Sequence, residues 1–221
     1  MANCDSKKIP PIAPPKIKKS HLEGVYTRRM TLLSMWAKQR WIILSVVAII
    51  MLALIVLKFM GRIWWCECGF GVWTWEAAAI NTSQWLGDPY TFSHVLHGFI
   101  FYWALSPFKK YLSVPHRLLI ALGIEVGWEI LENSPIIINR YRANTASLDY
   151  YGDSVLNSFG DLLACLAGFW FAWRMPWWLT VAATVAIELL MLWLFRDNLT
   201  LNVIMLVYPI EAIKEWQLMN S

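Results

Sequence analysis

Histidines and glutamates stand at helical spacing within two apolar stretches of the sequence. His94 and His97 lie about one turn apart, and Glu125, Glu129 and Glu132 follow i, i+4, i+7 spacing. The three glutamates would therefore project from one face of a helix. Three acids on one face repel each other unless they are protonated, paired or bound to a metal ion. The pattern favours a functional polar site, with a purely structural network as the alternative.

A third polar stripe begins at Asp153 and continues with Asn157 and Asp161, again at four-residue spacing. At 1.5 Å per residue, Asp161 would lie about 12 Å along the helix from Asp153. An ionisable group at membrane depth costs several kcal/mol, so it normally faces the interior of a bundle and has a partner there. We therefore expect the three stripes to converge on one site.

Candidate roles follow from the chemistry of these side chains. The candidate catalytic residues are His97, Glu129, Asp153 and Asp161. The candidate ligands of a divalent metal ion, which would activate water, are His94, His97, Glu125, Glu129 and Glu132. The candidate substrate-binding residues are Arg140, Arg142, Asn157 and Asp149. The two arginines would hold an anionic head group of a lipid or envelope precursor.

Most of these residues also have a structural interpretation. Asp153 or Ser154 could cap the helix that follows. Arg140 and Arg142 could be interfacial anchors or ion-pair partners of nearby acids. A single histidine in such a segment is more often packed and hydrogen-bonded than bound to a metal.

The composition indicates that the stripes lie within a membrane. Hydrophobic residues make up 58% of the chain and charged residues 15%, with a mean hydropathy of +0.46, which is too apolar for an ordinary soluble domain. Tryptophans cluster near the ends of apolar runs, as aromatic side chains do at membrane–water interfaces. We expect an all-α fold, a polytopic membrane helix bundle of about five transmembrane helices, with four to six as the range.

The expected spans are apolar runs of helical length. A helix of about 20 residues crosses the ~30 Å hydrocarbon core of a bilayer. Within a transmembrane domain of residues 41–221, the expected spans are 41–60, 93–108, 118–138, 154–173 and 177–195. The run 199–213 is interrupted by Asn202 and Pro209, so we expect it to be interfacial or re-entrant.

Residues 1–40 form a basic tail that contains several prolines. They carry nine Lys or Arg and two acids, whereas residues 41–221 carry ten and thirteen. Basic residues beside the first span favour a cytoplasmic N-terminus, and the prolines favour disorder. Binding of nucleic acid or anionic lipid is the less favoured interpretation of the tail. We expect membrane lipids as partners and no nucleic acid, in a bacterial inner membrane. The polar stripes would then lie toward the periplasmic face.

Familiar catalytic motifs do not occur. There is no Gly-x-Ser-x-Gly elbow, Walker loop or His-Glu-x-x-His sequence. Cys66 and Cys68 form an isolated Cys-x-Cys pair, which is too little for a zinc site. We favour two unpaired thiols there, with a disulfide on the outer side as the alternative.

The segment from Gly61 to Gln217 resembles an uncharacterised multi-pass inner-membrane family of proteobacteria, known as a domain of unknown function. The stretches that carry the resemblance are 88–98, 125–135, 140–142, 151–161 and 196–202. The resemblance implies a membrane location and no particular activity.

A weaker similarity is to VanZ-like membrane proteins. Their ordered pattern of polar residues corresponds to His97, Glu125, Ser147, Asp149, Asn157 and Gly160. That resemblance implies an association with the cell envelope. The additional acids Glu129, Glu132 and Asp161 depart from the VanZ-like pattern.

Three functions fit these observations. The first is a membrane-embedded enzyme that acts on a lipid or envelope precursor at the outer face. The second is a small-molecule or ion binding or transport protein, in which the acids carry protons or cations. The third is an assembly or structural factor whose polar network fixes helix packing. The sequence leaves the oligomeric state open.

Overall fold

The computed structural model describes residues 40–77, 79–145 and 147–219, and every regular element in these ranges is a helix. The predicted all-α class is therefore confirmed for this part of the chain. The predicted basic tail lies outside the described residues, except for Arg40.

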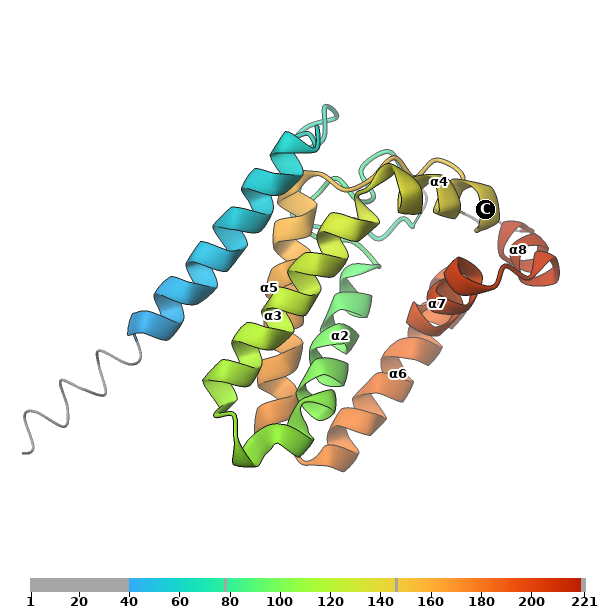
Figure 1. Ribbon diagram of the computed structural model, residues 1–221. Coiled ribbons are helices and arrows are strands. Elements are labelled where there is room, and N and C mark those ends of the chain that lie inside the picture. Colours follow the sequence, from blue (N-terminus) through green and yellow to red (C-terminus); the bar gives the residue numbers. More distant parts are fainter. Residues whose placement is uncertain (1–39, 78, 146, 220–221) are drawn as a thin grey trace, which may run out of the picture. The chain divides into compact units, whose positions relative to one another are not determined.

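The helices follow each other with short connections, apart from one long loop between residues 60 and 90 (Figure 1). In chain order they are Arg40–Phe59, α2 (Thr91–Ala104), the 3-10 helix η1 (Ser106–Lys110), α3 (Val114–Glu132), α4 (Pro135–Asn144), α5 (Val155–Arg174), α6 (Trp177–Phe195), α7 (Leu199–Val207) and α8 (Glu211–Leu218).

Three described helices are long and apolar enough to cross a membrane by length and composition, namely Arg40–Phe59, α5 and α6. The other two expected spans correspond to α2 and α3. With 14 residues, α2 is about 21 Å long, which is shorter than a typical hydrocarbon core. With 19 residues, α3 is long enough but carries three glutamates. A count of five spans thus stays a prediction.

The third expected span, residues 118–138, is divided between two helices. Here α3 ends at Glu132, and α4 begins at Pro135. Proline has no backbone N–H and suits the first turn of a helix, so it starts α4 instead of extending α3. The run 199–213 is likewise divided between α7 and α8, on either side of Pro209.

The helix α5 lies at the centre of the packing and contacts α2, α3 and α6. A cluster of buried residues joins Ile50 and Ala53 of the first helix to Leu122 of α3 and Leu162 of α5. The backbones of α2 and α5 approach each other closely, because a Cβ atom added at Gly98 would overlap the backbone of Cys165 and Phe169. Small residues permit such backbone contact between membrane helices.

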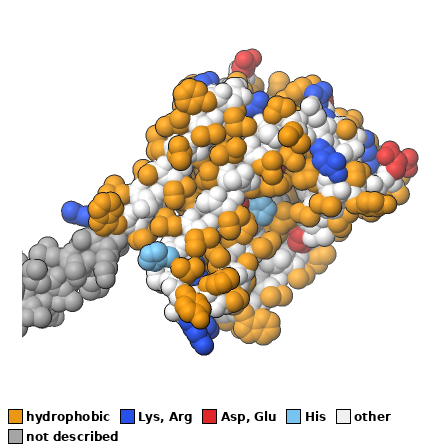
Figure 2. All heavy atoms as spheres, viewed as in Figure 1, with side chains coloured by type: hydrophobic (Ala, Val, Ile, Leu, Met, Phe, Trp, Pro, Cys, Tyr) orange, Lys and Arg blue, Asp and Glu red, His pale blue; other side chains and the backbone are white. Residues whose placement is uncertain are grey.

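The outward faces of the helices are apolar. Most residues of Arg40–Phe59 and of α6 are exposed, although both helices are hydrophobic along their whole length. Hydrophobic side chains cover most of the face seen in Figure 2, with Lys and Arg mainly near the helix ends. An all-round hydrophobic helix with exposed sides is typical of contact with lipid.

Side chains cap the two helices that follow polar connections. Ser154 caps α5 by accepting a hydrogen bond from the backbone N–H of Asn157, so Ser154, and not Asp153, takes this role. Asn198 caps α7 through the N–H of Leu201. Glu188 of α6 also accepts hydrogen bonds from the first N–H groups of α7, which gives this acid a structural role.

Asp197 holds the C-terminal helices together. Its carboxylate accepts hydrogen bonds from Asn202 of α7 and Gln217 of α8, and it lies beside Tyr90 at the start of α2. Burial raises the pKa of Asp197 to about 6, although these hydrogen bonds partly oppose the increase.

The loop between residues 60 and 90 contains a disulfide between Cys66 and Cys68. The preferred interpretation of two unpaired thiols is therefore wrong, and the alternative holds. Cys165 on α5 is a free, buried thiol.

Replacement of Gly98 by alanine should separate α2 from α5. We expect Gly98→Ala to destabilise the protein by about 1–3 kcal/mol, because the added methyl group meets backbone and not a flexible side chain. The control is Gly123→Ala on α3, where a Cβ has open space and alanine favours the helix. Thermal unfolding in detergent measures both, and equal melting temperatures would contradict the close approach.

The buried carboxyl group of Asp197 should make stability depend on pH. Because its pKa in the folded protein (about 6) exceeds the ordinary value of 3.8, the folded state holds the proton more tightly. Stability should fall as pH rises from about 4 to 6, by roughly 3 kcal/mol for this group, and then level off. Melting temperatures of Asp197→Asn should lose this part of the pH dependence. The exposed Asp149→Asn should retain it, and identical profiles for Asp197→Asn and the wild type would refute the assignment.

Candidate metal centre

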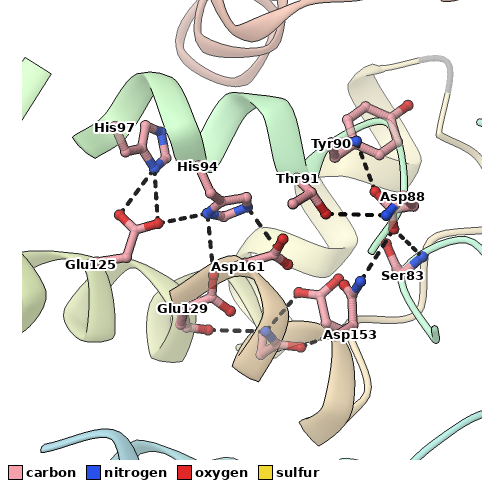
Figure 3. A network of polar contacts seen from close by, with 12 residues as sticks. Ser83, Asp88, Tyr90, Thr91, His94, His97, Glu125, Glu129, Asp153 and Asp161 are labelled. Carbon is pink, nitrogen blue, oxygen red and sulfur yellow. Dashed lines mark hydrogen bonds and ion pairs between the residues drawn. The ribbon is translucent and has the colours of Figure 1, made fainter. Parts of the chain in front are cut away.

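Glu125 on α3 holds two histidines of α2 in place. Its Oε1 lies 2.6 Å from Nδ1 of His94, and its Oε2 lies 3.0 Å from Nδ1 of His97 (Figure 3). Glu125 is fully buried, and the histidine rings meet edge to face with centroids 5.1 Å apart. A carboxylate accepts hydrogen bonds, so each histidine donates through Nδ1 and keeps Nε2 for another partner.

Two further carboxylates stand beside His94, one near each ring nitrogen. Oε1 of Glu129 lies 3.4 Å from Nδ1 of His94, and Oδ2 of Asp161 lies 3.9 Å from its Nε2. One ligand atom from each of these three residues lies within 4.8 Å of the others. The three residues come from α3, α2 and α5, so the bundle itself assembles the group.

Glu129 and Asp161 have oxygens without a hydrogen-bond donor. Both carboxylate oxygens of Glu129 and Oδ1 of Asp161 are buried, and no described residue donates a hydrogen bond to them. Leaving buried charged oxygens without partners costs several kcal/mol. A divalent cation at this group would give the carboxylates of Glu129 and Asp161 a positive partner.

Two groups of residues could therefore hold a metal ion, and the second fits better. In the first, His94, His97 and Glu125, both carboxylate oxygens of Glu125 already accept hydrogen bonds from the histidines. In the second, His94, Glu129 and Asp161, a histidine is oriented by a carboxylate behind it. Metal-binding histidines commonly donate their other N–H to a carboxylate in this way.

A layer of hydrogen bonds supports the site near the start of α5. The carboxylate of Asp153 accepts hydrogen bonds from the side chains of Asn133 and Tyr150, and the backbone N–H of Asp153 donates to Oδ1 of Asn133. Asp88 accepts from the backbone of Ser83 and Tyr90. Burial raises the pKa of both Asp153 and Asp88, with these hydrogen bonds acting in the opposite direction.

A cavity of about 340 Å³ opens beside the candidate metal centre. Its polar wall includes His94, His97, Glu132, Asp153 and Asp161, while Glu129 lies behind this wall. Its apolar wall comes from α2, α3 and α7, with the side chains of Phe101, Ile124, Trp128, Leu199, Val203 and Leu206. A cavity with one polar and one apolar wall suits an amphipathic ligand.

The predicted convergence of three stripes is observed. His94, His97, Glu125, Glu129 and Asp161 form one contact network, and Glu132, Asp153 and Asn157 line the same cavity.

The predicted substrate-binding arginines lie elsewhere. Arg140 donates hydrogen bonds to the backbone carbonyls of Leu206 and Val207, and so fastens α4 to the end of α7. Arg142 contacts the ring of Tyr151. Neither arginine lines the cavity, and neither does Asp149, which is exposed.

Sequence reasoning missed the aromatic members of the cavity. Tyr90, Trp128, Tyr141 and Tyr150 all line it. Trp128 and Tyr90 adjoin polar motifs, which is the only signal in the sequence that could have indicated them. Tyr141 and Tyr150 reach the cavity because α4 folds back from the end of α3, and that depends on the break at Pro135.

Comparisons with known proteins identify a family. Residues 57–219 match the family described as Protein of unknown function (DUF2585). A UPF0314 protein of Sphingopyxis alaskensis is 49% identical, over 80% of this chain and 94% of its own length. UPF0314 proteins of Sinorhizobium fredii and Agrobacterium fabrum are 48% and 50% identical, over 81% and 76% of this chain and 92% and 86% of their own lengths.

These relatives have names that state no activity and do not mention VanZ-like proteins. No solved structure matches the chain. The expected family of unknown function is nevertheless confirmed, because the match covers most of the chain at nearly half identity. The chain belongs to the UPF0314 family, whose domain is DUF2585.

Proposed function

We propose that this UPF0314 protein is a membrane enzyme that hydrolyses an amphipathic lipid or envelope precursor with the help of a divalent metal ion. The ion would be held by His94, Glu129 and Asp161. The observation that carries the proposal is the pair of Glu129 oxygens, which are fully buried and accept no hydrogen bond from the described residues.

The residues around the ion have complementary roles. A bound divalent ion polarises an ester or phosphoester and favours the ionisation of water. His97 lines the cavity with its Nδ1 fixed by Glu125, so it is the candidate general base that takes a proton from the attacking water. The oxygen of water then bonds to the acyl or phosphoryl group, the bond to the leaving alcohol breaks, and that alcohol receives the proton.

The cavity supports an amphipathic substrate. Its apolar wall can take hydrocarbon, while its polar wall carries two of the three candidate metal ligands, His94 and Asp161. The site lies toward the end of the bundle at which the first helix ends, α2 begins and α5 begins (Figure 1). With a cytoplasmic N-terminus, that end would face the periplasm.

Neutral replacement of a ligand should remove the metal. We expect the purified wild type, loaded with Mn²⁺ or Zn²⁺ and desalted, to keep about one ion per chain. Glu129→Gln and Asp161→Asn should each weaken binding at least about tenfold, since each loses one charged ligand. Elemental analysis measures the ion, and Glu215→Gln on α8 is the exposed acid control.

The same preparations should differ in activity. With total membrane lipid as substrate, mass spectrometry should detect a hydrolysis product that depends on metal and is absent with Glu129→Gln. A wild type that binds no more metal than Glu129→Gln would refute the metal centre. A metal-loaded wild type that forms no product would refute the hydrolase.

Replacement of the Glu125 carboxylate should weaken metal binding indirectly, through the histidines that it orients. Glu125 is not itself a proposed ligand, but it orients His94 and His97. We expect Glu125→Gln to weaken metal binding about 10–100-fold, as for other carboxylates behind a ligating histidine. The dissociation constant can be measured by titration with a fluorescent chelator. His116→Ala, at an exposed histidine of α3, should leave it unchanged, and an equal effect of both variants would contradict the role of Glu125.

A further inference from the structure

Two tyrosines form adjacent walls at the α4 end of the cavity. Tyr141 lies on α4 and Tyr150 in the connection to α5, and both line the cavity. Their ring centroids are 5.4 Å apart and their planes are 79° from parallel. The rings thus meet edge to face and form a corner, in which an ammonium group can lie against the remaining open part of a ring face.

Carboxylates stand beside the same corner. Tyr150 donates its hydroxyl hydrogen to Asp153 at 2.9 Å, and the hydroxyl of Tyr141 lies beside Glu132. Both acids line the cavity. Aromatic faces combined with carboxylates are the usual surroundings of a bound organic cation.

The charges along the cavity also favour a cation at this end. None of the described residues that line it is Lys or Arg. Glu125 is paired with two histidines, and a divalent ion would neutralise the charges of Glu129 and Asp161. Glu132 and Asp153 form no salt bridge with a described residue, and a buried carboxylate without such a partner is unfavourable.

We propose that this corner, formed by Tyr141, Tyr150, Glu132 and Asp153, binds the ammonium group of an amine-bearing lipid head group. The inference deepens the proposed function and rests on it, since it names the substrate class of the same cavity. The phosphate of such a zwitterionic head group would lie toward the metal ion, its ammonium toward α4, and its acyl chains along the apolar wall. An anionic head group without an amine would leave the two carboxylates unbalanced.

Native mass spectrometry of the full chain in detergent tests the head-group preference. The probes are phosphatidylethanolamine and phosphatidylglycerol with identical acyl chains, added in equal amounts to metal-loaded protein. We expect the wild type to bind the amine-bearing lipid at least about fivefold more than the glycerol-bearing one. Glu132→Gln and Tyr150→Leu should each bring the ratio close to one. The matched controls are Tyr151→Leu and Asp149→Asn, exposed neighbours that do not line the cavity, and they should keep the wild-type ratio.

The outcomes separate this inference from the proposed function, because the metal content of each sample is measured in parallel. A wild-type ratio near one, in protein that retains its metal, overturns the ammonium site alone. A preference that persists in both Glu132→Gln and Tyr150→Leu also overturns it. Two metal ions per chain, one of which is lost in Glu132→Gln, would also overturn the ammonium site, because a second ion would then occupy the corner. Protein that never binds metal refutes the proposed function instead. Glu132→Gln preserves side-chain shape, so the test stands even if Tyr150→Leu does not fold.

Discussion

A charged carboxylate inside an apolar helix bundle must find partners within the protein, because lipid offers none. Glu125 meets this requirement by accepting hydrogen bonds from two histidines of the neighbouring helix. That interaction fixes the rotation of α2 against α3 and orients both imidazole rings. It also turns His94 so that its second nitrogen faces Asp161 of α5. One buried side chain thereby organises residues from three helices.

The same need for partners applies to the carboxylate of Glu129. Glu125 and Glu129 are one helical turn apart on α3 and equally buried, yet of these two carboxylates only that of Glu125 accepts hydrogen bonds from described residues. A structural network would be expected to satisfy both acids, since each unsatisfied charge destabilises the fold. The difference between the two neighbouring glutamates therefore favours a bound cation, and not helix packing alone, as the explanation of the acids on α3.

Spacing along single helices was enough to predict which polar side chains lie close together, but not which of them would hold an ion. Asp161, predicted as a catalytic residue, stands with His94 and Glu129, whereas the predicted ligand Glu132 belongs to neither candidate group among the described residues. The positions of Glu125, Glu129 and Asp161 on one face each follow from 3.6 residues per turn, and the cost of burying acids predicts that the faces meet. The family resemblance was confirmed over the same part of the chain. Spacing could not predict that the carboxylate of Glu125 accepts hydrogen bonds from the histidines while that of Glu129 does not. This difference depends on side-chain distances across two helices.

Connections were harder to predict than helices. A hydrophobic run continues through Pro135, so one span was expected where α3 and α4 meet at an angle. That turn brings Tyr141 into the cavity and directs Arg140 to the backbone of α7. Sequence reasoning therefore expected the arginines, which do not line this cavity, beside a ligand, and it overlooked the tyrosines, which do. Both differences have the same origin, because the direction of a chain after a break depends on tertiary packing that local periodicity does not encode.

The backbone contact between α2 and α5 determines the geometry of the site independently of most other residues. Gly98 and Gly168 let the two main chains touch, so the separation of His94 from Asp161 is determined by backbone and not by the size of intervening side chains. Residues on the exposed, apolar sides of the helices take no part in that spacing. The exterior of the bundle can accordingly vary in sequence while the interior geometry stays constant.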